Sequence, residues 1–362
     1  MSFMPLHRRQ DAAVPDGGIA VLVVDDSVVV RRIMTRVLEA DPRFTVAGAV
    51  ASGAQALELV QARPVDLVLL DVQMPGLDGM QVLPRLLDPA RHIRVALLSG
   101  TYREGSELAL RALAMGASDV VEKPSAGHFS DRFVARLLDR LAHLAGAAAQ
   151  ARRPDQPDAA AIRLRPAGTQ VRALGIGAST GGISAILSVI GGFAAPLPFP
   201  LFITQHLPAN FQPLFAEQLR RASGLPVLLA EDGQPVRAGA IHLAPGHAHL
   251  SLARDADDVV SIRLSREACK HGGVPAVDPM FGALARVYGE GACGVILSGM
   301  GRDGAAGALR IVEAGGWLIA QDVRSSAVWG MPGAVARAGL ASLVLPPTAI
   351  AGAIMTQLRA RP

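Results

Sequence analysis

Acidic side chains follow two short apolar segments in the N-terminal half of the chain. Asp25 and Asp26 come directly after the segment IAVLVV, and Asp71 comes directly after VDLVLL. If both segments are neighbouring parallel strands, their carboxyl ends meet at one edge of a sheet, where the three carboxylates converge. Converging carboxylates repel one another unless a cation holds them, and hard oxygen ligands suit Mg²⁺. The spacing therefore predicts a Mg²⁺ site formed by these three residues.

Two further polar side chains stand at the ends of apolar segments that should reach the same edge. Ser99 ends RVALLS, and Lys123 follows DVVE. Together with a bound cation, a hydroxyl and an ammonium group can polarise a phosphoryl donor, so that Asp71 attacks as the nucleophile and the resulting aspartyl phosphate is neutralised. Each of these residues alone is more often a helix cap or a solvated turn residue. It is the joint pattern that favours phosphorylation of Asp71.

A second set of residues, in the C-terminal half, has the types found in a serine hydrolase. Ser179 lies in GASTGG, between the strand-like VRALGI and the helical pattern ISAILSVI, so free N–H groups at the helix start can face a developing oxyanion. His206 follows FPLFITQ, and Asp303 follows CGVILSG and a short turn. Three strand ends on one rim can bring nucleophile, base and orienting acid together. We expect Ser179 to attack an ester carbonyl, His206 to take its proton, and Asp303 to fix the imidazole tautomer.

The same C-terminal motifs allow other functions. GASTGG alone could be a phosphate-binding turn. The string GMGRDG, residues 299–304, has the spacing of a dinucleotide-binding fingerprint, and Asp322 ends the next strand-like segment. An ionised Asp303 at the start of the helix would repel a pyrophosphate, however. A non-catalytic binding protein switched by phosphorylation is a further alternative, against which the presence of all three triad residue types argues.

Histidines near the string APGH are candidate metal ligands. His242, His247 and His249 flank this turn. They lack cysteine or acidic companions nearby, so we expect them to line a surface loop and not to bind a metal.

Parallel strands joined by helical crossovers must position the N-terminal residues, because short Val, Leu and Ile segments alternate with helical patterns from Ile19 onward. The expected strands are IAVLVV, FTVAGAV, VDLVLL, RVALLS and DVVE. This spacing predicts an α/β domain of the flavodoxin-like type, with five strands, over residues 19–145. Its last helix should begin near Ser130, as the cap, and bury a face made of Phe133, Val134, Leu137, Leu138, Leu141 and Leu144.

A second α/β domain should position the C-terminal residues. Residues 151–168 are rich in Pro, Ala and mixed charge, which is typical of an exposed interdomain linker. The segments beyond it that are expected to be strands are VRALGIG, FPLFITQ, VLLAE, GAIHLAP, HLSLA, VSIRL, CGVILSG, GWLIAQD and ASLVL. They predict a doubly wound, mostly parallel sheet over residues 169–358, with a β-hairpin where HLSLARDADDVVSIRLS forms strand, turn and strand.

The N-terminal motifs VVDDS, LLDVQMPGLDG, LLSG and VEKP resemble the response-regulator receiver family in order and spacing, over about residues 19–144. The resemblance implies that Asp71 is the phosphoacceptor, that Asp25 and Asp26 hold Mg²⁺ with it, and that Ser99 and Lys123 contact the phosphoryl group. It also implies a cis peptide bond after the lysine of VEKP. At position 120 the chain has valine, where many receivers have a switching aromatic residue.

The C-terminal motifs IGASTGG, ITQHLPANF, AEDG, HLAPG, VDPMF, SGMGRDGAAG and AQDVRSSAVWGMP resemble the chemotaxis protein-glutamate methylesterase family, over about residues 171–345. The resemblance implies a catalytic triad of Ser179, His206 and Asp303, with backbone groups of Thr180 and Met300 contributing to the oxyanion site. Joined to a receiver, these motifs match the architecture of the chemotaxis response-regulator methylesterases.

This family likeness also implies partners and a gate. The substrate would be methylated glutamates on the cytoplasmic helices of chemoreceptors, with release of methanol and, in some members, deamidation of receptor glutamines. A sensor histidine kinase would be the phosphodonor, the protein would be cytoplasmic, and the catalytic domain would need no cofactor. We expect the unphosphorylated receiver to lie over the rim that carries Ser179, and phosphorylation of Asp71 to weaken that contact.

Composition excludes several other classes of protein. A formal net charge of +4 without Lys/Arg runs, and 4% aromatic residues, argue against nucleic acid as a partner. Cys269 and Cys293 provide neither a metal spacing nor a disulfide framework, which fits a reducing cytosol. Residues 1–18 lack the apolar segment of a secretion signal. The uncharged segment 173–205 is broken by glycines and prolines, so we expect strand and helix there, without membrane insertion.

Overall fold

The structure is a computed structural model that describes residues 18–88, 91–99, 106–123, 130–151, 170–193, 196–269 and 273–359. The chain divides into two compact units, one built around each of its two large sheets. Most of the predicted linker at residues 151–168 lies outside the described residues, as do the N-terminal residues before Gly18 and Pro124 with the predicted cis bond.

The first unit is built around a five-stranded sheet in the order β2-β1-β3-β4-β5. Its strands are β1 (Ile19–Val24), β2 (Phe44–Val50), β3 (Leu67–Asp71), β4 (Arg94–Ser99) and β5 (Asp119–Glu122). The pairs β1–β2, β1–β3 and β3–β4 are parallel. All five strands lie in the predicted segments, and the flavodoxin-like α/β class is confirmed. The difference is that Asp71 is the last residue of its strand and not the residue after it.

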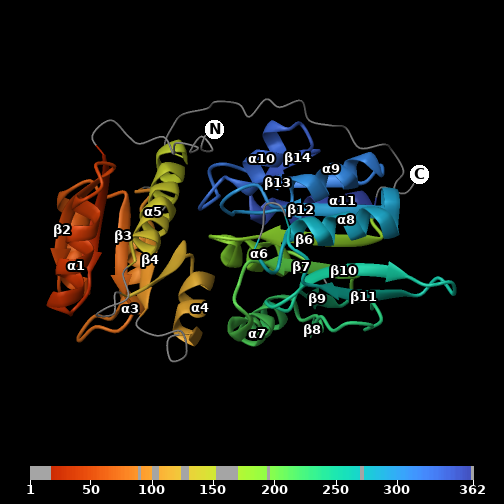
Figure 1. Ribbon diagram of the computed structural model, residues 1–362, viewed down its shortest axis with the longest axis horizontal. Coiled ribbons are helices and arrows are strands. Elements are labelled where there is room, and N and C mark those ends of the chain that lie inside the picture. Colours follow the sequence, from red (N-terminus) through yellow and green to blue (C-terminus); the bar gives the residue numbers. More distant parts are fainter. Residues whose placement is uncertain are drawn as a thin grey trace, which may run out of the picture. The chain divides into compact units, whose positions relative to one another are not determined.

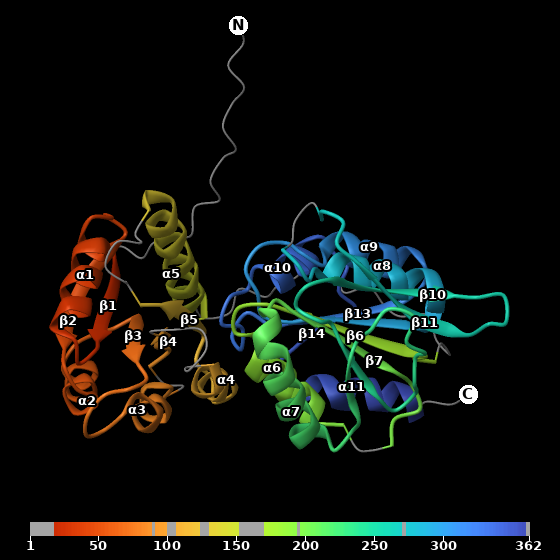
Figure 2. The same ribbon diagram turned by 60° about the horizontal axis from the view of Figure 1, so that its bottom comes forward.

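Helices alternate with these strands along the chain. They are α1 (Val28–Glu39), α2 (Gly53–Ala62), α3 (Gly79–Leu86), α4 (Ser106–Ala114) and α5 (Asp131–Ala151). Figure 2 shows α1 and α5 on one face of the sheet and α2 and α3 on the other. The hydroxyl of Ser130 accepts a hydrogen bond from the backbone N–H of Phe133, which confirms the predicted cap of α5. The four leucines of the predicted apolar face are buried, whereas Phe133 and Val134 are partly exposed.

The second unit is built around a seven-stranded sheet in the order β14-β13-β12-β6-β7-β9-β8, in which every pair is parallel. Its strands are β6 (Ala173–Ala178), β7 (Leu201–Gln205), β8 (Val227–Leu229), β9 (Ile241–Leu243), β12 (Ala292–Ile296), β13 (Trp317–Gln321) and β14 (Leu343–Leu345). The strands β10 (His249–Arg254) and β11 (Val260–Ser265) form a separate antiparallel hairpin. The predicted doubly wound sheet and the hairpin are both confirmed.

Two layers of helices enclose this sheet. The helices are α6 (Gly182–Gly191), α7 (Gln212–Ser223), α8 (Val277–Tyr288), α9 (Ala305–Glu313), α10 (Met331–Arg337) and α11 (Pro347–Arg359), with short 3-10 turns η1 (Ala209–Phe211) and η2 (Gly289–Gly291). Figure 1 labels these helices, and Figure 2 shows α8, α9 and α10 on one face of the sheet and α6, α7 and α11 on the other. The core between α8 and the sheet contains Phe202, Phe281, Met280 and Leu284, all fully buried. None of the described helices is both long and apolar enough to cross a membrane.

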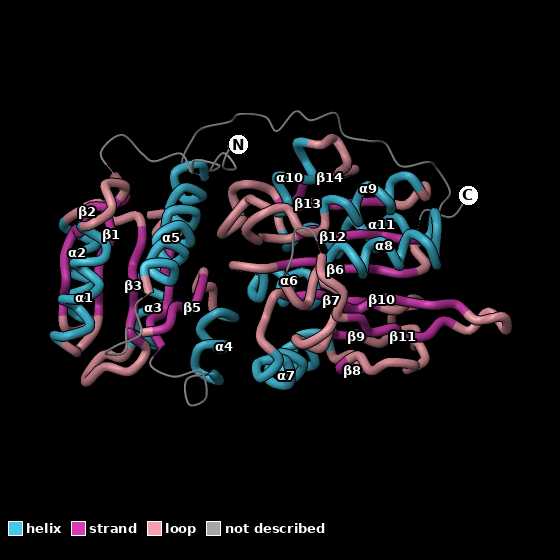
Figure 3. The backbone as a smooth tube through the Cα atoms, in the orientation of Figure 1, coloured by secondary structure: helices cyan, strands magenta, loops and turns pink. Residues whose placement is uncertain are grey.

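The strand order explains where functional residues can gather. In the second sheet the chain starts at the central strand β6, proceeds to β7 on one side, and later returns to β12 on the other. Figure 3 shows the loops that join the strands of this sheet to the helices. Ligands of open α/β sheets bind at such a switch point, because connecting loops diverge there. The first sheet has its own switch point between β1 and β3.

Candidate active site and phosphoacceptor site

The turn between β6 and α6 holds Ser179. The backbone N–H of Ser179 donates to the carbonyl of Ser298 at 2.9 Å, and its carbonyl accepts from Gly182 at 2.8 Å. Gly181 has a φ of 72°, and a Cβ there would lie 2.2 Å from the Cβ of Ala327, so only glycine fits. The turn is therefore tight and braced against its surroundings, as predicted for a serine presented between strand and helix.

Two buried contacts near this turn were not identified from the sequence. The hydroxyl of Ser298 donates to the carbonyl of Thr180 at 2.7 Å. A Cβ on Gly299 would lie 2.8 Å from the Cβ of Ser179, so the segment that follows β12 passes directly against the candidate nucleophile. The string SGMG pointed to this segment, but only the sheet order brings it next to β6.

The candidate base follows the neighbouring strand. Ala178 pairs with Gln205 at the ends of β6 and β7, and the backbone N–H of His206 donates to the carbonyl of Ala178 at 3.0 Å. The buried side chain of Gln205 ties the two ends together, because its amide donates to the carbonyl of Ser179 at 2.8 Å. Neighbouring strands lie about 4.8 Å apart, so side chains leaving these two ends can meet.

The orienting acid reaches His206 from beyond β12. The Nε2 atom of His206 lies 2.7 Å from Oδ2 of Asp303, whose side chain is 1% exposed. The same Oδ2 accepts from the N–H of Val277 at 2.7 Å, while Oδ1 accepts from Asp278 at 3.1 Å and Gly304 at 2.9 Å. The start of α8 thus holds the carboxylate in place. Helix α9 begins two residues later than the sequence indicated, at Ala305.

These contacts set the charge of Asp303 and the tautomer of the imidazole. Burial alone would raise the pKa of Asp303. Hydrogen bonds from His206, Val277 and Asp278 lower this pKa by more than burial raises it, so the pKa lies below its ordinary value. Since an ionised carboxylate only accepts, Nε2 of His206 carries the proton and Nδ1 has the free lone pair. No hydrogen bond joins this ring to the Ser179 hydroxyl, although both residues are described. Such contacts often tighten only when substrate binds.

Candidate oxyanion donors lie on either side of the nucleophile. Within the described part of the chain, the backbone N–H groups of Thr180 and Met300 have no acceptor. Thr180 follows Ser179 at the helix start, and Met300 follows Gly299, which packs against Ser179. Both groups are therefore available to a developing negative charge.

The dinucleotide interpretation of residues 299–304 is not favoured. The helix after this string is α9, and the N–H of Gly307 in its first turn already donates to the carboxylate of Asp278 at 2.7 Å. Asp303 itself is buried and bound to His206. A pyrophosphate would thus meet two carboxylates where the fingerprint needs open N–H groups.

The prediction that the three histidines near APGH line a surface loop is wrong for two of them. His242 lies within β9 and His249 within β10, and both side chains are fully buried. His242 stacks on Phe202, with ring centroids 5.4 Å apart, and burial lowers its pKa. Only His247 is exposed. Apolar neighbours on both sides of His242 and His249 were the signal for strand positions. Neither cysteine forms a disulfide, and Cys293 is buried in β12.

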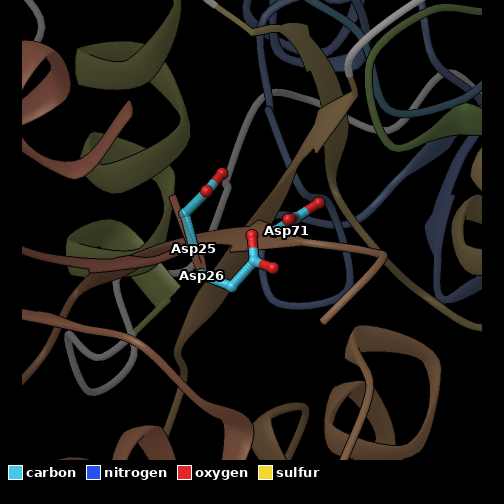
Figure 4. Close-up of side chains that lie close together, drawn as sticks. All are labelled: Asp25, Asp26 and Asp71. Atoms are coloured by element: carbon cyan, nitrogen blue, oxygen red, sulfur yellow. The ribbon is translucent and has the colours of Figure 1, made fainter. Parts of the chain in front are cut away.

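The first unit brings its three acidic residues together. Figure 4 shows the side chains of Asp25, Asp26 and Asp71 side by side, from the ends of β1 and β3. One oxygen of each lies within 4.8 Å of the others, an arrangement that could hold a metal ion. Asp25 and Asp71 are buried, whereas Asp26 is exposed. Three carboxylates with one open side provide oxygen ligands of the kind that Mg²⁺ prefers.

A lysine balances these charges. Nζ of Lys123 lies 2.7 Å from Oδ2 of Asp71 and 2.9 Å from Oδ2 of Asp25. Burial raises the pKa of Asp71; Lys123 lowers it and Asp25 raises it again, so the pKa stays above its ordinary value. Lys123 also donates its backbone N–H to the carbonyl of Ser99 at 2.7 Å, which brings the ends of β4 and β5 to one place. All five predicted residues thus occupy one edge of the sheet.

Known protein families match both units of the chain. The sequence matches the CheB methylesterase family over residues 174–354 and the response regulator receiver domain over residues 21–130. A Rhodospirillum centenum protein named protein-glutamate methylesterase/protein-glutamine glutaminase of group 2 operon is 37% identical, over 93% of this chain and 94% of that protein. A Nitrobacter hamburgensis protein-glutamate methylesterase/protein-glutamine glutaminase is 40% identical, over 91% of each.

A solved structure supports the assignment of the second unit. The crystal structure of the Thermotoga maritima CheB methylesterase catalytic domain is 34% identical, has a TM-score of 0.50, and matches 52% of this chain and 99% of that domain. The predicted likeness is confirmed: the chain belongs to the CheB methylesterase family and combines a response regulator receiver domain with a methylesterase domain.

Proposed function

We propose that this chain hydrolyses methyl esters of glutamate side chains on chemoreceptors, releasing methanol, and that phosphorylation of Asp71 increases the rate. The observation that supports it most is the 2.7 Å hydrogen bond between His206 and the buried Asp303, beside the turn that holds Ser179. The relatives at 37% and 40% identity, named protein-glutamate methylesterases, support the substrate.

The proposed mechanism uses the two ring nitrogens of His206 for different tasks. The hydroxyl of Ser179 attacks the ester carbonyl while Nδ1 takes its proton, and Asp303 stabilises the imidazolium through Nε2. The N–H groups of Thr180 and Met300 donate to the oxyanion of the tetrahedral intermediate. His206 then returns the proton to the leaving methanol, and water hydrolyses the acyl-enzyme by the same path in reverse.

The same site could release ammonia from a glutamine amide. Attack by Ser179 gives the same acyl-enzyme, and His206 protonates the leaving amine instead of an alkoxide. The relatives are also named protein-glutamine glutaminases, which is the observation that favours this second activity.

We propose that the N-terminal site is a Mg²⁺-dependent phosphoacceptor. Asp25, Asp26 and Asp71 would hold the ion, which when bound supplies positive charge to the phosphoryl group. Asp71 would be the nucleophile, with Ser99 and Lys123 contacting the phosphoryl oxygens. A sensor histidine kinase is the proposed phosphodonor, and the cytoplasm, where the receptor helices lie, is the proposed location.

The proposed functional boundaries remain those of the sequence: a receiver at residues 19–145, a linker at 151–168 and a catalytic domain at 169–358. Methanol release from a methylated chemoreceptor, measured with and without a small-molecule phosphodonor, tests the whole proposal. An absence of methanol release under both conditions would contradict it.

Replacing Asp71 by asparagine is expected to abolish stimulation by the phosphodonor and to leave the basal rate of methanol release unchanged. The amide cannot form a stable acyl phosphate, whereas Ser179 and its partners are untouched. A tenfold stimulation in the native chain corresponds to about 1.4 kcal/mol of shifted equilibrium, which a new phosphoryl charge can supply. Asp131→Asn, at an exposed carboxylate of α5, is the matched control and should keep the stimulation. Equal stimulation of Asp71→Asn and native chain would exclude Asp71 as the phosphoacceptor.

Addition of Mg²⁺ is expected to stabilise the folded receiver and so to raise its unfolding temperature. At a Mg²⁺ concentration of ten times Kd, the free energy of unfolding should rise by about 1.4 kcal/mol. Because burial raises the pKa of Asp71, the folded receiver without the ion loses stability as pH rises through the range between the ordinary and the raised pKa. The gain from Mg²⁺ should therefore be larger above that range than below it. Scanning calorimetry at one pH above and one pH below that range measures the gain in unfolding temperature. An equal gain in Asp26→Asn would contradict the assigned ligands.

A further inference from the structure

Helices α8 and α9 lack N-terminal caps of their own. The N-cap residue of α8 is Ala276 and that of α9 is Gly304, and neither supplies a side-chain acceptor. Helix starts leave backbone N–H groups that need acceptors, and anions are favoured there. In both helices, backbone N–H groups of the first turn donate to a carboxylate that belongs to the segment of the other helix.

Each of the two carboxylates accepts hydrogen bonds from the N-terminal turn of the other helix. Asp303, just before α9, accepts from the N–H groups of Val277 at 2.7 Å and Asp278 at 3.1 Å in the first turn of α8. Asp278, in the first turn of α8, accepts in return from the N–H of Gly307 in α9, at 2.7 Å. The exchange joins the starts of both helices through three hydrogen bonds.

Close packing makes this arrangement specific. A Cβ on Gly307 would lie 2.6 Å from the Cβ of Phe281 and 2.8 Å from the backbone oxygen of Asp278. Only glycine lets the backbone of α9 approach α8 so closely, and this approach puts the Gly307 N–H within reach of Asp278. The motif VDPMF, which contains Asp278, thus has a physical task that the triad alone does not explain.

We propose that Asp278 is a positioning residue of the hydrolytic site, which holds the start of α9 against α8 and thereby keeps the Asp303 carboxylate on His206. This inference rests on the proposed function. Asp278 acts through Asp303, whose Oδ2 lies 2.7 Å from Nε2 of His206. Without the Asp278–Gly307 bond, only the two hydrogen bonds from Val277 and Asp278 to the Asp303 carboxylate still join the segment that carries Asp303 to the start of α8, so this carboxylate is held less firmly. A misplacement of about 1 Å in a catalytic group can cost about 10² in rate.

The test compares two substitutions at one position in the full chain. Asp278→Ala removes the acceptor, whereas Asp278→Asn keeps an oxygen that can accept from Gly307. Asp255→Ala is the control, because Asp255 also accepts backbone N–H groups but does so in the turn between β10 and β11. Methanol release per folded molecule gives kcat and KM. The NMR signal of the imidazole proton shared by His206 and Asp303, assigned with His206→Ala, reports the geometry independently of turnover.

We expect Asp278→Ala to lower kcat by about 10² with KM unchanged, and to weaken or shift the imidazole signal. Asp278→Asn should restore most of kcat and the signal, and Asp255→Ala should resemble the native chain in both. A native signal and kcat in folded Asp278→Ala would overturn the proposal, as would equal losses in the alanine and asparagine variants. If the native chain releases no methanol, the proposed function fails, yet the imidazole signal still tests whether Asp278 positions Asp303.

Discussion

Replacing Ser179 by alanine is expected to lower the rate of methanol release by about 10⁴ or more. Alanine retains the Cβ of residue 179. This Cβ lies close to Gly299, since a Cβ added to Gly299 would be only 2.8 Å from it. The backbone bonds of the turn, to Ser298 and Gly182, do not involve the hydroxyl. The substitution therefore removes the nucleophile with little change to the fold, so the loss should appear in kcat and not in stability.

The matched control is Ser188→Ala, which removes the hydroxyl of a partly exposed serine from α6, the helix that follows the Ser179 turn. Its methanol release and its unfolding temperature should equal those of the native chain. Retention of more than about a tenth of the native rate in folded Ser179→Ala would exclude an acyl-enzyme at this serine. Absence of turnover in both the native chain and the variant would instead favour a phosphorylation-switched binding protein.

Replacing Asp303 by asparagine is expected to lower the rate by about 10⁴, as in other triads whose acid becomes an amide. The carboxylate oxygens accept from two sides: Oδ2 from His206 and Val277, and Oδ1 from Asp278 and Gly304. Either orientation of an asparagine amide turns its NH₂ group toward two donors. The variant therefore loses the imidazole tautomer or the helix contacts, and leaves buried groups without partners.

Asp303→Asn should consequently be less stable as well as less active. A buried polar group left unsatisfied costs about 1–3 kcal/mol. Because the pKa of Asp303 lies below its ordinary value, the native carboxylate stabilises the fold above that ordinary pKa, and this stabilisation is lost as pH falls through the lowered folded pKa. Urea unfolding should thus separate native and variant chains at neutral pH, and less so in strong acid.

Asp322→Asn is the control for this experiment. Asp322 also follows a strand of the same sheet, but its carboxylate accepts from Ser325 and not from the imidazole. Its rate of methanol release should stay close to native. A folded Asp303→Asn that keeps more than about a tenth of the native rate would show that His206 does not depend on this acid, and would remove the main support for the triad.

Strand prediction succeeded because the signal is local. Fully buried parallel strands such as β3 and β12 need continuous apolar segments, which stand out between polar helices. The acids and hydroxyls that end these segments were equally visible. Their convergence followed from a general rule, that loops at the carboxyl ends of parallel strands meet at the switch point. Asp25, Asp71, His206 and Asp303 could thus be placed at their sheet edges in advance.

The supporting residues were not visible in this way. Ser298, Gln205 and Asp278 are ordinary polar residues in sequence, and each acts through a bond to a segment distant in the chain. His242 was misplaced because a histidine next to a glycine turn is usually exposed, whereas here its ring stacks on Phe202 and its Nε2 accepts from the backbone N–H of Arg237.

Residue patterns over short distances were enough to predict the family, the strands and the chemical types at each strand end. The folded arrangement was needed to establish which nitrogen of His206 faces Asp303, which donors lower the pKa of that acid, and how Asp278 joins α8 to α9. The physical reason is that hydrogen bonds and packing at 2.7–3.1 Å depend on where whole helices lie on the sheet, which the order of residues along the chain does not specify.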